Sequence, residues 1–217
     1  MTGDLFADLT PANQPDEVLD EGAMLLRGFA LPVADLLLRD IDAVVAQAPW
    51  RHMITPGGFR MSVAMTNTGP LGWVSSSRGY RYDPIDPESG QPWPALPESF
   101  RTLARDAAAK AGFPAFAPDA CLINRYDPGT KLSLHQDRDE RDRLAPIVSV
   151  SLGLPATFLW GGLKRSDPTR KYRVEHGDVV VWGGPSRFVF HGVSPVKGGV
   201  HPLLGNQRIN ITFRKAY

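Results

Sequence analysis

The sequence places a histidine and an acid two residues apart, His135 and Asp137, in the segment KLSLHQD. Residues i and i+2 of a β-strand point to the same face, so both side chains could bind one metal ion if this segment is a strand. The pair alone is a weak signal, because a chain with five histidines has roughly an even chance of containing a His-x-acid pair. The alternative is an ordinary surface strand.

A second histidine from elsewhere in the chain would complete a face of two histidines and one carboxylate. The other histidines are His52, His176, His191 and His201. His191 follows the apolar run RFVF and should end a strand, whereas His176 lies in a turn, EHGD, and is expected to be exposed. Two imidazoles and one carboxylate with open positions suit Fe(II) oxygen chemistry. Zn(II) is the alternative metal, although zinc hydrolysis would usually require a nearby general base as well.

The run QRINITFR near the C-terminus alternates polar and apolar side chains. Its polar face carries Arg208, Asn210, Thr212 and Arg214. If this face is buried, its two guanidiniums need an anion, because burying an unpaired charge is costly. A dicarboxylate co-substrate would supply one, since arginine can bind a carboxylate through two parallel bonds. The alternative is an edge strand with solvated arginines.

The segment INRY follows the same logic. Asn124 and Tyr126 share one face, where an amide and a phenol could complete a site for the co-substrate. The alternative for Tyr126 is a core tyrosine whose hydroxyl is simply hydrogen-bonded.

The second half of the chain is predicted to be a β domain that positions these groups. From residue 120 onward short apolar or alternating runs recur, separated by turns such as DPG and GG. The runs are CLINRY, KLSLHQD, PIVSVSLG, TFLWGG, YRVEHGDVVVWGG, RFVFHGV and QRINITFR. Seven or so strands at short intervals predict a double-sheet jelly roll or barrel.

The first half is predicted to hold two helices and a loop-rich segment. Apolar residues recur at the helical period over 33–48, and a second helix over 100–111 should end at the glycine and proline that follow it. A strand is expected over 24–30. Residues 51–97 hold several aromatic residues among many Gly, Ser and Pro, which favours short strands joined by exposed loops.

Charge is distributed unevenly along the 217 residues. The first 21 residues carry six acids and no Lys or Arg, whereas the remainder holds all 24 Lys and Arg but 17 of the 23 Asp and Glu. A basic body is compatible with a polyanionic partner or with an ordinary solvated surface. A basic cluster that suits phosphate contact, or a solvated hairpin, consists of Lys164, Arg165, Arg170, Lys171 and Arg173.

Localisation is indicated by what the sequence lacks. The single cysteine, Cys121, permits no internal disulfide, which fits a reducing compartment. The N-terminus does not resemble a secretory signal, and no run of about 18 apolar residues is present. We therefore expect a cytoplasmic protein without a membrane segment, and we expect it to be a monomer.

Longer motifs resemble those of the AlkB-type nucleic-acid dealkylases, and the resemblance covers nearly the whole chain. The most specific stretches are TPGGFRMSVAMTNTGPLGW, DACLINRYDPGTKLSLHQDRDE, PIVSVSLGLPATF, EHGDVVVWGG and RINITFR. The resemblance implies a mostly β fold, a double-stranded β-helix with N-terminal helices and a nucleotide-recognition lid. The charge distribution sets residues 1–21 apart as an acidic lead-in, and the resemblance makes 22–217 a single dioxygenase domain, with the lid at 51–97 and the catalytic core at 119–217.

The resemblance also assigns residues. It implies that iron is bound by His135, Asp137 and His191. It implies that 2-oxoglutarate is bound by Asn124, Tyr126, Arg208, Asn210 and Arg214. It implies that the damaged nucleotide is contacted by Met65, Trp73, Tyr80, Arg81, Tyr82, Asp139 and Arg165. The residues VSSSR between Trp73 and Tyr80 diverge from the family.

The function implied is Fe(II)- and 2-oxoglutarate-dependent oxidation, with O2, of alkylated bases such as 1-methyladenine and 3-methylcytosine. The partner would be single- or double-stranded DNA, with RNA as a further substrate, and the products would be formaldehyde, succinate and CO2. Exposed aromatic residues in the loop-rich segment suit stacking against an extruded base. The alternatives are a dioxygenase of the same fold acting on a protein or a small metabolite, and a metal-free binding module.

Overall fold

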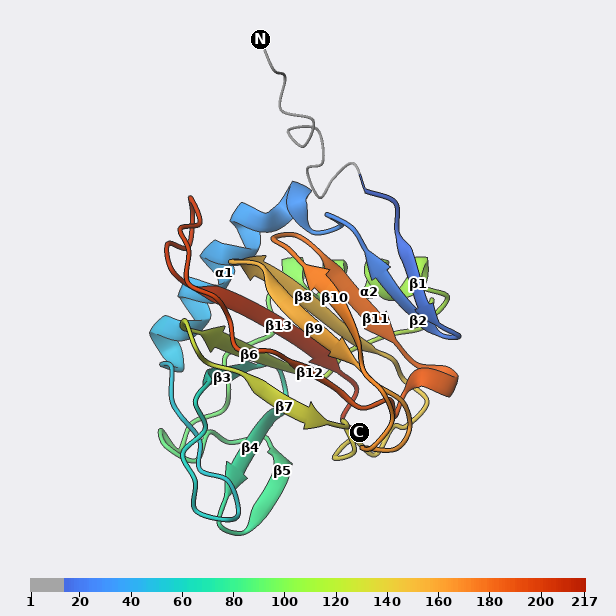
Figure 1. Ribbon diagram of the computed structural model, residues 1–217. Coiled ribbons are helices and arrows are strands. Elements are labelled where there is room, and N and C mark those ends of the chain that lie inside the picture. The colour runs from blue at the N-terminus through green and yellow to red at the C-terminus, as the bar shows by residue number, and fades with distance from the viewer. Residues whose placement is uncertain (1–13) are drawn as a thin grey trace.

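The computed structural model describes residues 14–217, which form mainly antiparallel β-strands (Figure 1). A seven-stranded sheet has the order β1–β2–β11–β8–β13–β6–β3. Its strands are β1 (Glu17–Asp20), β2 (Ala23–Leu26), β3 (Ala64–Thr68), β6 (Ala120–Tyr126), β8 (Ile147–Gly153), β11 (Val179–Trp182) and β13 (Arg208–Arg214). A four-stranded sheet has the order β10–β9–β12–β7. Its strands are β7 (Leu132–His135), β9 (Ala156–Trp160), β10 (Arg170–Val174) and β12 (His191–Val193).

The predicted jelly roll is confirmed, with eight strands after residue 119 rather than seven. The run YRVEHGDVVVWGG is two strands, β10 and β11, because the chain turns between them at Gly177, whose φ is +88°. The strand expected over 24–30 is shorter, since β2 ends at Leu26 and a turn with Gly28 at φ +60° follows.

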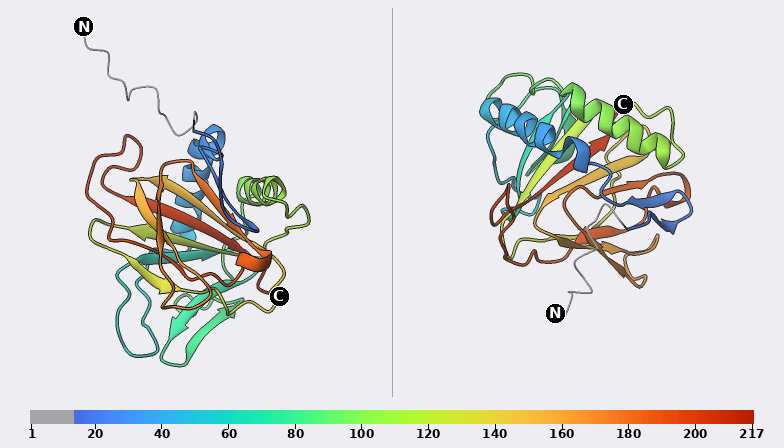
Figure 2. Two further views of the ribbon diagram at one scale, coloured as in Figure 1. Left: turned by 45° about the vertical axis from the view of Figure 1, so that its right-hand side comes forward. Right: turned by 90° about the horizontal axis from the view of Figure 1, so that it is seen from above.

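Two helices cover one face of the seven-stranded sheet, close to where they were predicted. They are α1 (Ala34–Gln47) and α2 (Glu98–Lys110), and both lie on the same side of the sheet in Figure 2. A short 3-10 helix, η2 (Leu31–Val33), precedes α1, and its proline supplies the fixed φ that starts a helical turn. Helix α2 ends before Gly112, which has a φ of +93°.

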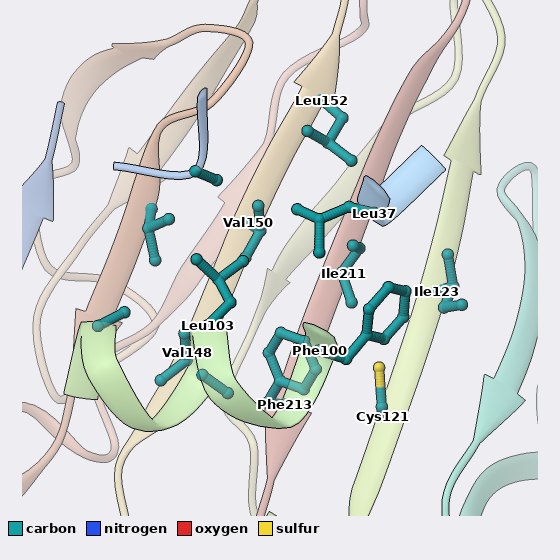
Figure 3. Packing of buried hydrophobic residues seen from close by; sticks show 14 of the residues in the cluster. Leu37, Phe100, Leu103, Cys121, Ile123, Val148, Val150, Leu152, Ile211 and Phe213 are labelled. Atoms are coloured by element: carbon teal, nitrogen blue, oxygen red, sulfur yellow. The ribbon is translucent and has the colours of Figure 1, made fainter. Parts of the chain in front are cut away.

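The helices and the sheet enclose one of two main hydrophobic cores. Leu37 of α1 and Phe100 of α2 pack against the apolar face of β13, which carries Ile211 and Phe213 (Figure 3). The Phe100 and Phe213 rings meet edge to face at 5.8 Å between centroids. Burying the apolar side of β13 here turns its polar side toward the other sheet.

The second core lies between the two sheets. It includes Leu122 and Tyr126 of β6, Phe158 and Trp160 of β9, and Trp182 of β11. These side chains fill part of the space between the two layers.

A separate two-stranded hairpin, β4 (Gly72–Ser76) and β5 (Gly79–Asp83), projects beyond β3 and β7 at the bottom of Figure 1. The hairpin and β3 both fall within 51–97, and β3 is the edge strand of the large sheet beside β6. Trp93 anchors the hairpin base, because its Nε1 donates to the carbonyl of Asp83 at 2.9 Å.

Part of the predicted acidic lead-in, residues 1–13, lies outside the described residues. Its described part contains strand β1, and its acids pair with basic groups of the body. Asp16 bonds to Lys110 at 2.7 Å, Glu17 pairs with Arg27, and Asp20 pairs with Arg170. Among residues 14–217, no helix is long and apolar enough to cross a membrane.

Candidate active site

A cavity of about 520 Å³ opens between the two sheets beside the hairpin. Its floor is formed by polar side chains of β6 and β13, its walls by β7 and β12, and its mouth by Trp73 and Tyr80 of the hairpin. Residues from widely separated parts of the chain therefore meet in one space.

Three predicted metal ligands, His135, Asp137 and His191, gather at one wall of this cavity and are called the triad below. Their ligand atoms lie within 4.8 Å of one another. His135 ends β7 and His191 begins β12, and the two residues are direct partners in the pairing of those strands. Asp137 lies just beyond the end of β7, because the strand stops at His135. The two side chains are nevertheless close together, as their spacing of two residues predicted.

Backbone contacts orient both imidazoles of the triad. Nδ1 of His135 lies 2.9 Å from the carbonyl of Ser133, and Nδ1 of His191 lies 3.0 Å from the carbonyl of Val189. A carbonyl can only accept, so each Nδ1 carries the hydrogen and each Nε2 keeps its lone pair. These Nε2 atoms lie 3.8 and 3.7 Å from the carboxylate oxygens of Asp137. All three lone-pair donors thus face one point.

The electrostatics of the triad favour the protonation states that a metal needs. Burial lowers the pKa of His191 to about 3, and the nearby His135 acts in the same direction. Burial raises the pKa of Asp137, but attraction to Arg214, and then to the two histidines, outweighs it and holds the pKa well below its usual range. His191 is therefore neutral and Asp137 charged at neutral pH, as metal ligation requires.

The polar face of β13 forms the floor of the cavity, as the alternation predicted. Arg208 is 2% exposed, and its Nη2 donates to Ser151 Oγ at 2.9 Å. Within residues 14–217, its Nε and Nη1 have no hydrogen-bond partner. Two buried donors without partners are costly, so this guanidinium is built to receive an anion.

The neighbouring polar residues of β13 are held by the sheet. Asn210 donates through Nδ2 to Ser149 Oγ and to the carbonyl of Val150, both at 2.8 Å, and its Oδ1 accepts from Thr212 at 2.9 Å. Arg214 donates through Nη2 to Asp137 Oδ1 at 3.1 Å, which connects the floor to the triad.

Strand β6 adds the predicted amide and phenol beside β13. The guanidinium of Arg208 lies over the ring of Tyr126, 4.8 Å from its centroid. Burial raises the pKa of Tyr126, so its hydroxyl keeps its proton. Oδ1 of Asn124 is buried and lacks a hydrogen-bond partner in the described part of the chain. Both side chains line the cavity.

The mouth of the cavity is an aromatic wall. Trp73 and Tyr80 stack at 5.2 Å between centroids and 19° between planes. Nε1 of Trp73 donates to Asp139 Oδ2 at 2.8 Å, which ties the hairpin to the loop that follows the triad. Met65 of β3 and Arg165 also line the cavity.

Some predicted site residues are not brought to the cavity. Arg81 is exposed and pairs with Asp83 at 3.1 Å. Tyr82 is 7% exposed, and its hydroxyl donates to Glu140 Oε1 at 2.5 Å. Neither residue lines the cavity. Side chains alternate along β5, so Arg81 points away from Tyr80, whereas Tyr82 lies at the base of the hairpin against the main body.

Two other expectations need adjustment. His176 is half-buried rather than exposed, because its Nδ1 accepts from the backbone N–H of Gly153 at 3.0 Å. In the basic cluster, Arg170 pairs with Asp20 and Arg173 with Glu175, which partly neutralises it. Arg165 is the member of the cluster that lines the cavity.

Three buried polar residues that support the site were not identified from the sequence. Asn67, 0% exposed, both donates to and accepts from the backbone of Trp73 at 3.0 Å. Glu140 and Arg187 form a buried ion pair behind the triad at 3.0 Å. No apolar run in the sequence marks Asn67 as buried, because it lies in the polar stretch TNT of β3, and no spacing rule connects Glu140 to Arg187, 47 residues away.

The sequence matches the model of one protein family, described as the 2OG-Fe(II) oxygenase superfamily, over residues 22–214. The chain belongs to this superfamily. It is 60% identical over 213 residues to the alpha-ketoglutarate-dependent dioxygenase AlkB of Escherichia coli, covering 98% of this chain and 97% of that one. It is 28% identical to the DNA N(6)-methyladenine demethylase ALKBH1D of Arabidopsis thaliana, covering 91% of this chain and 50% of that one. The solved structure of OsALKBH1 superposes with a TM-score of 0.80 at 32% identity, covering 93% of this chain and all of that one.

The oxygenase therefore uses Fe(II), 2-oxoglutarate and O2, and the cavity fits these groups. Two imidazoles and a carboxylate are the donor set for Fe(II) in such enzymes. The donors of Arg208 that lack partners suit a carboxylate of a small dicarboxylate, and the Asn124 side chain lines the same cavity. The resemblance to AlkB-type enzymes is confirmed by the identity to the bacterial relative.

Proposed function

We propose that this oxygenase removes alkyl groups from damaged bases such as 1-methyladenine and 3-methylcytosine in DNA, with RNA as a further substrate. Formaldehyde, succinate and CO2 would be the products from a methyl group. The observation that carries the proposal is that the triad and the stacked pair of Trp73 and Tyr80 face the same cavity. A metal centre beside an aromatic platform suits chemistry on a flat ring.

The triad would hold the iron through Nε2 of each histidine and a carboxylate oxygen of Asp137. Three protein ligands on one face leave the other coordination positions open. Asp137 Oδ1 is engaged by Arg214, whereas Oδ2 is buried and without a hydrogen-bond partner among the described residues. We assign Oδ2 to the metal for this reason.

The 2-oxoglutarate site would consist of the polar faces of β6 and β13. Arg208, in the floor, would bind the distal carboxylate through one of its nitrogens that lack a partner, Nε or Nη1, which point to different edges of the guanidinium. The residues that would complete this site are Asn124, Tyr126, Asn210 and Arg214. Arg214 is already bonded to Asp137, which suits the carboxylate that lies nearest the metal.

The damaged base would stack on Trp73 at the mouth of the cavity. Its exocyclic amine would lie near Asp139, whose Oδ2 is bonded to Trp73 Nε1. Met65 and His135 would bound the ring on its other sides, and Arg165 would contact a phosphate or sugar at the rim. Tyr80 would extend the platform toward a neighbouring nucleotide.

With these groups bound, Fe(II), O2 and 2-oxoglutarate would supply the oxidation of the N-alkyl carbon, whose release as an aldehyde would restore the base. The chain's own contribution is placement and shielding. Phe158, Trp182 and Val193 form apolar walls near the triad that exclude water. The aromatic mouth holds the base so that its alkylated edge faces the metal.

The domain organisation inferred from the sequence also remains a proposal. Residues 22–217 would be a single dioxygenase domain, with 51–97 as the nucleotide-recognition lid and 119–217 as the catalytic core. We further propose that the protein is a monomer and that it acts in the cytoplasm. A reducing compartment is supported by its one cysteine, Cys121, which is buried and unpaired in the described structure.

The test is succinate release, with Fe(II), 2-oxoglutarate and O2, on a panel of oligonucleotides carrying defined alkylated bases. Matched unmodified oligonucleotides are the control. Succinate release that depends on the lesion, with the parent base recovered, supports the proposal. Release that no alkylated oligonucleotide stimulates would instead favour a protein or small-metabolite substrate for the same metal centre.

A further inference from the structure

A buried network of charged side chains lies behind the triad and contains two residues with no role in the proposed chemistry. Glu140 Oε2 accepts from Arg187 Nη2 at 3.0 Å. Its other oxygen, Oε1, accepts from the Tyr82 hydroxyl at 2.5 Å and lies 3.4 Å from Nε of Arg214. Glu140 therefore contacts three side chains from three different segments of the chain.

Arg187 connects this network to the backbone of the triad. Its Nη1 donates to the carbonyl of Asp137 at 2.8 Å, and its Nε donates to the carbonyl of Ala145 at 3.0 Å. Arg187 is 2% exposed. The ion pair of Glu140 with Arg187 thus fixes the position of the loop that carries Asp137.

The charges of the network balance. Glu140 and Asp137 are 4% and 8% exposed, and they face the guanidiniums of Arg187 and Arg214, at 2% and 7%. Removing one carboxylate from such a set leaves a buried positive charge without compensation, which is strongly unfavourable. The remaining groups would then rearrange to share the carboxylate that is left.

The geometry of Arg214 determines what that rearrangement would do. Its Nη2 donates to Asp137 Oδ1, and its Nε faces Glu140. The two nitrogens of one guanidinium edge therefore contact two different carboxylates. An arginine edge binds a single carboxylate best through two parallel bonds. Without the charge of Glu140, this edge would turn onto both oxygens of Asp137 and cover Oδ2.

We infer that Glu140, held by Arg187, is a positioning residue that keeps Arg214 on one oxygen of Asp137 and leaves the other oxygen open to the metal. The inference rests on the proposed function, since it uses the metal role of Asp137 and the 2-oxoglutarate role of Arg214. Glu140 does not line the cavity, so it would act through Asp137 and Arg214, which do.

The experiment is a titration of the full-length protein with Mn(II) in the absence of O2, which reports metal binding without turnover. Glu140→Gln keeps the shape and removes the charge. Outer-shell substitutions typically reduce metal affinity about 10- to 100-fold, and we expect a loss in that range. Glu88→Gln, which alters an exposed carboxylate near Arg51, is the matched control and should stay within about twofold of wild type.

Two further measurements separate charge from simple loss of structure. Tyr82→Phe removes one hydrogen bond to Glu140 and no charge, so it should cost less Mn(II) affinity than Glu140→Gln. In turnover, Glu140→Gln should raise the apparent KM for 2-oxoglutarate much more than that for the oligonucleotide. An equal Mn(II) loss in Tyr82→Phe and Glu140→Gln would overturn the inference, as would unchanged Mn(II) binding in Glu140→Gln.

Melting curves establish whether Glu140→Gln is folded. If it is not, the double variant Glu140→Gln/Arg187→Gln removes one buried charge of each sign and should fold, yet still bind Mn(II) more weakly than wild type. Wild-type affinity in the folded double variant would overturn the inference. Failure of the wild-type protein to bind Mn(II) would instead count against the proposed function itself.

Discussion

Replacement of Arg208 by methionine should stabilise the protein without ligand and remove most of the stabilisation that 2-oxoglutarate provides. Methionine fills a similar length of the cavity floor but carries no charge and no donor. In the described structure, two of the three guanidinium nitrogens of Arg208 have no hydrogen-bond partner. Relief of this unsatisfied, buried charge should outweigh the loss of the bond to Ser151.

The size of the lost ligand effect follows from the contact. A hydrogen bond to a charged group contributes about 1.5–3 kcal/mol, which corresponds to roughly 10- to 150-fold in affinity. At a 2-oxoglutarate concentration of about 100 times the wild-type Kd, binding stabilises the wild type by about 2.7 kcal/mol. With the weaker affinity, the same concentration stabilises the variant by roughly 0.3–1.4 kcal/mol.

Thermal melting with Mn(II) under anaerobic conditions, with and without 2-oxoglutarate, measures both quantities. For a chain of this size, about 1 kcal/mol shifts Tm by roughly 2–4 °C, so the wild-type shift should exceed that of Arg208→Met by several degrees. Arg125→Met is the matched control, because Arg125 lies on the adjacent strand β6 but not in the cavity. Its guanidinium carbon lies 5.5 Å from the centroid of the Trp50 ring. An undiminished 2-oxoglutarate shift in Arg208→Met would remove Arg208 from the site.

Three further outcomes are expected. Alanine at any one triad position should abolish succinate release, with Tm nearly unchanged for His135→Ala and His191→Ala but lowered for Asp137→Ala, which leaves the buried Arg214 without its carboxylate partner, whereas His176→Ala should retain succinate release. Loss of metal binding in His176→Ala but not in His191→Ala would refute the triad. Trp73→Ala and Asp139→Ala should each reduce kcat/KM on cationic lesions more than on neutral ones. For Trp73→Ala, loss of the cation–π contact should make this difference about 2- to 30-fold. An equal loss on both lesion types would mean that shape alone determines which lesions are accepted. Gly72→Ala should reduce the free energy of unfolding by about 1–3 kcal/mol and lower Tm, because the added Cβ would collide with the Trp93 ring; an unchanged Tm would show that the hairpin base is loosely packed.

Much of the fold could be predicted because the spacing of apolar residues along the sequence differs between helices and strands. The helix over 33–48 was recognisable from its apolar spacing. Strand β13 was recognisable from its strict alternation, which arises because one side of the strand packs on the helices and the other faces the cavity. The boundaries were less accurate where a glycine turn interrupts an apolar run, as at Gly177. Such a turn depends on one backbone angle, and the hydrophobic pattern does not specify it.

The candidate site was predictable only where its residues share a strand or a motif. Alternation placed Arg208 and Asn210 on one face, and strand pairing then brought His135 beside His191. The convergence of Tyr82, Glu140 and Arg187 could not be inferred in this way, because it depends on how three separate segments pack. Contacts of this kind carry no periodic signal, so the supporting residues of the site were found only in the structure.

The triad and floor of the cavity lie in larger sheets than its aromatic mouth does. The triad and the floor belong to strands paired within the four- and seven-stranded sheets, and only Asp137 lies beyond a strand end. The aromatic mouth belongs to a two-stranded hairpin, a unit that is marginally stable by itself. The hairpin is tied to the body through the side chains of Asn67 and Trp93 and through the bond from Trp73 to Asp139. Changes at 74–78, where this chain reads VSSSR, can therefore alter which nucleotides are accepted while the metal and 2-oxoglutarate groups keep their places.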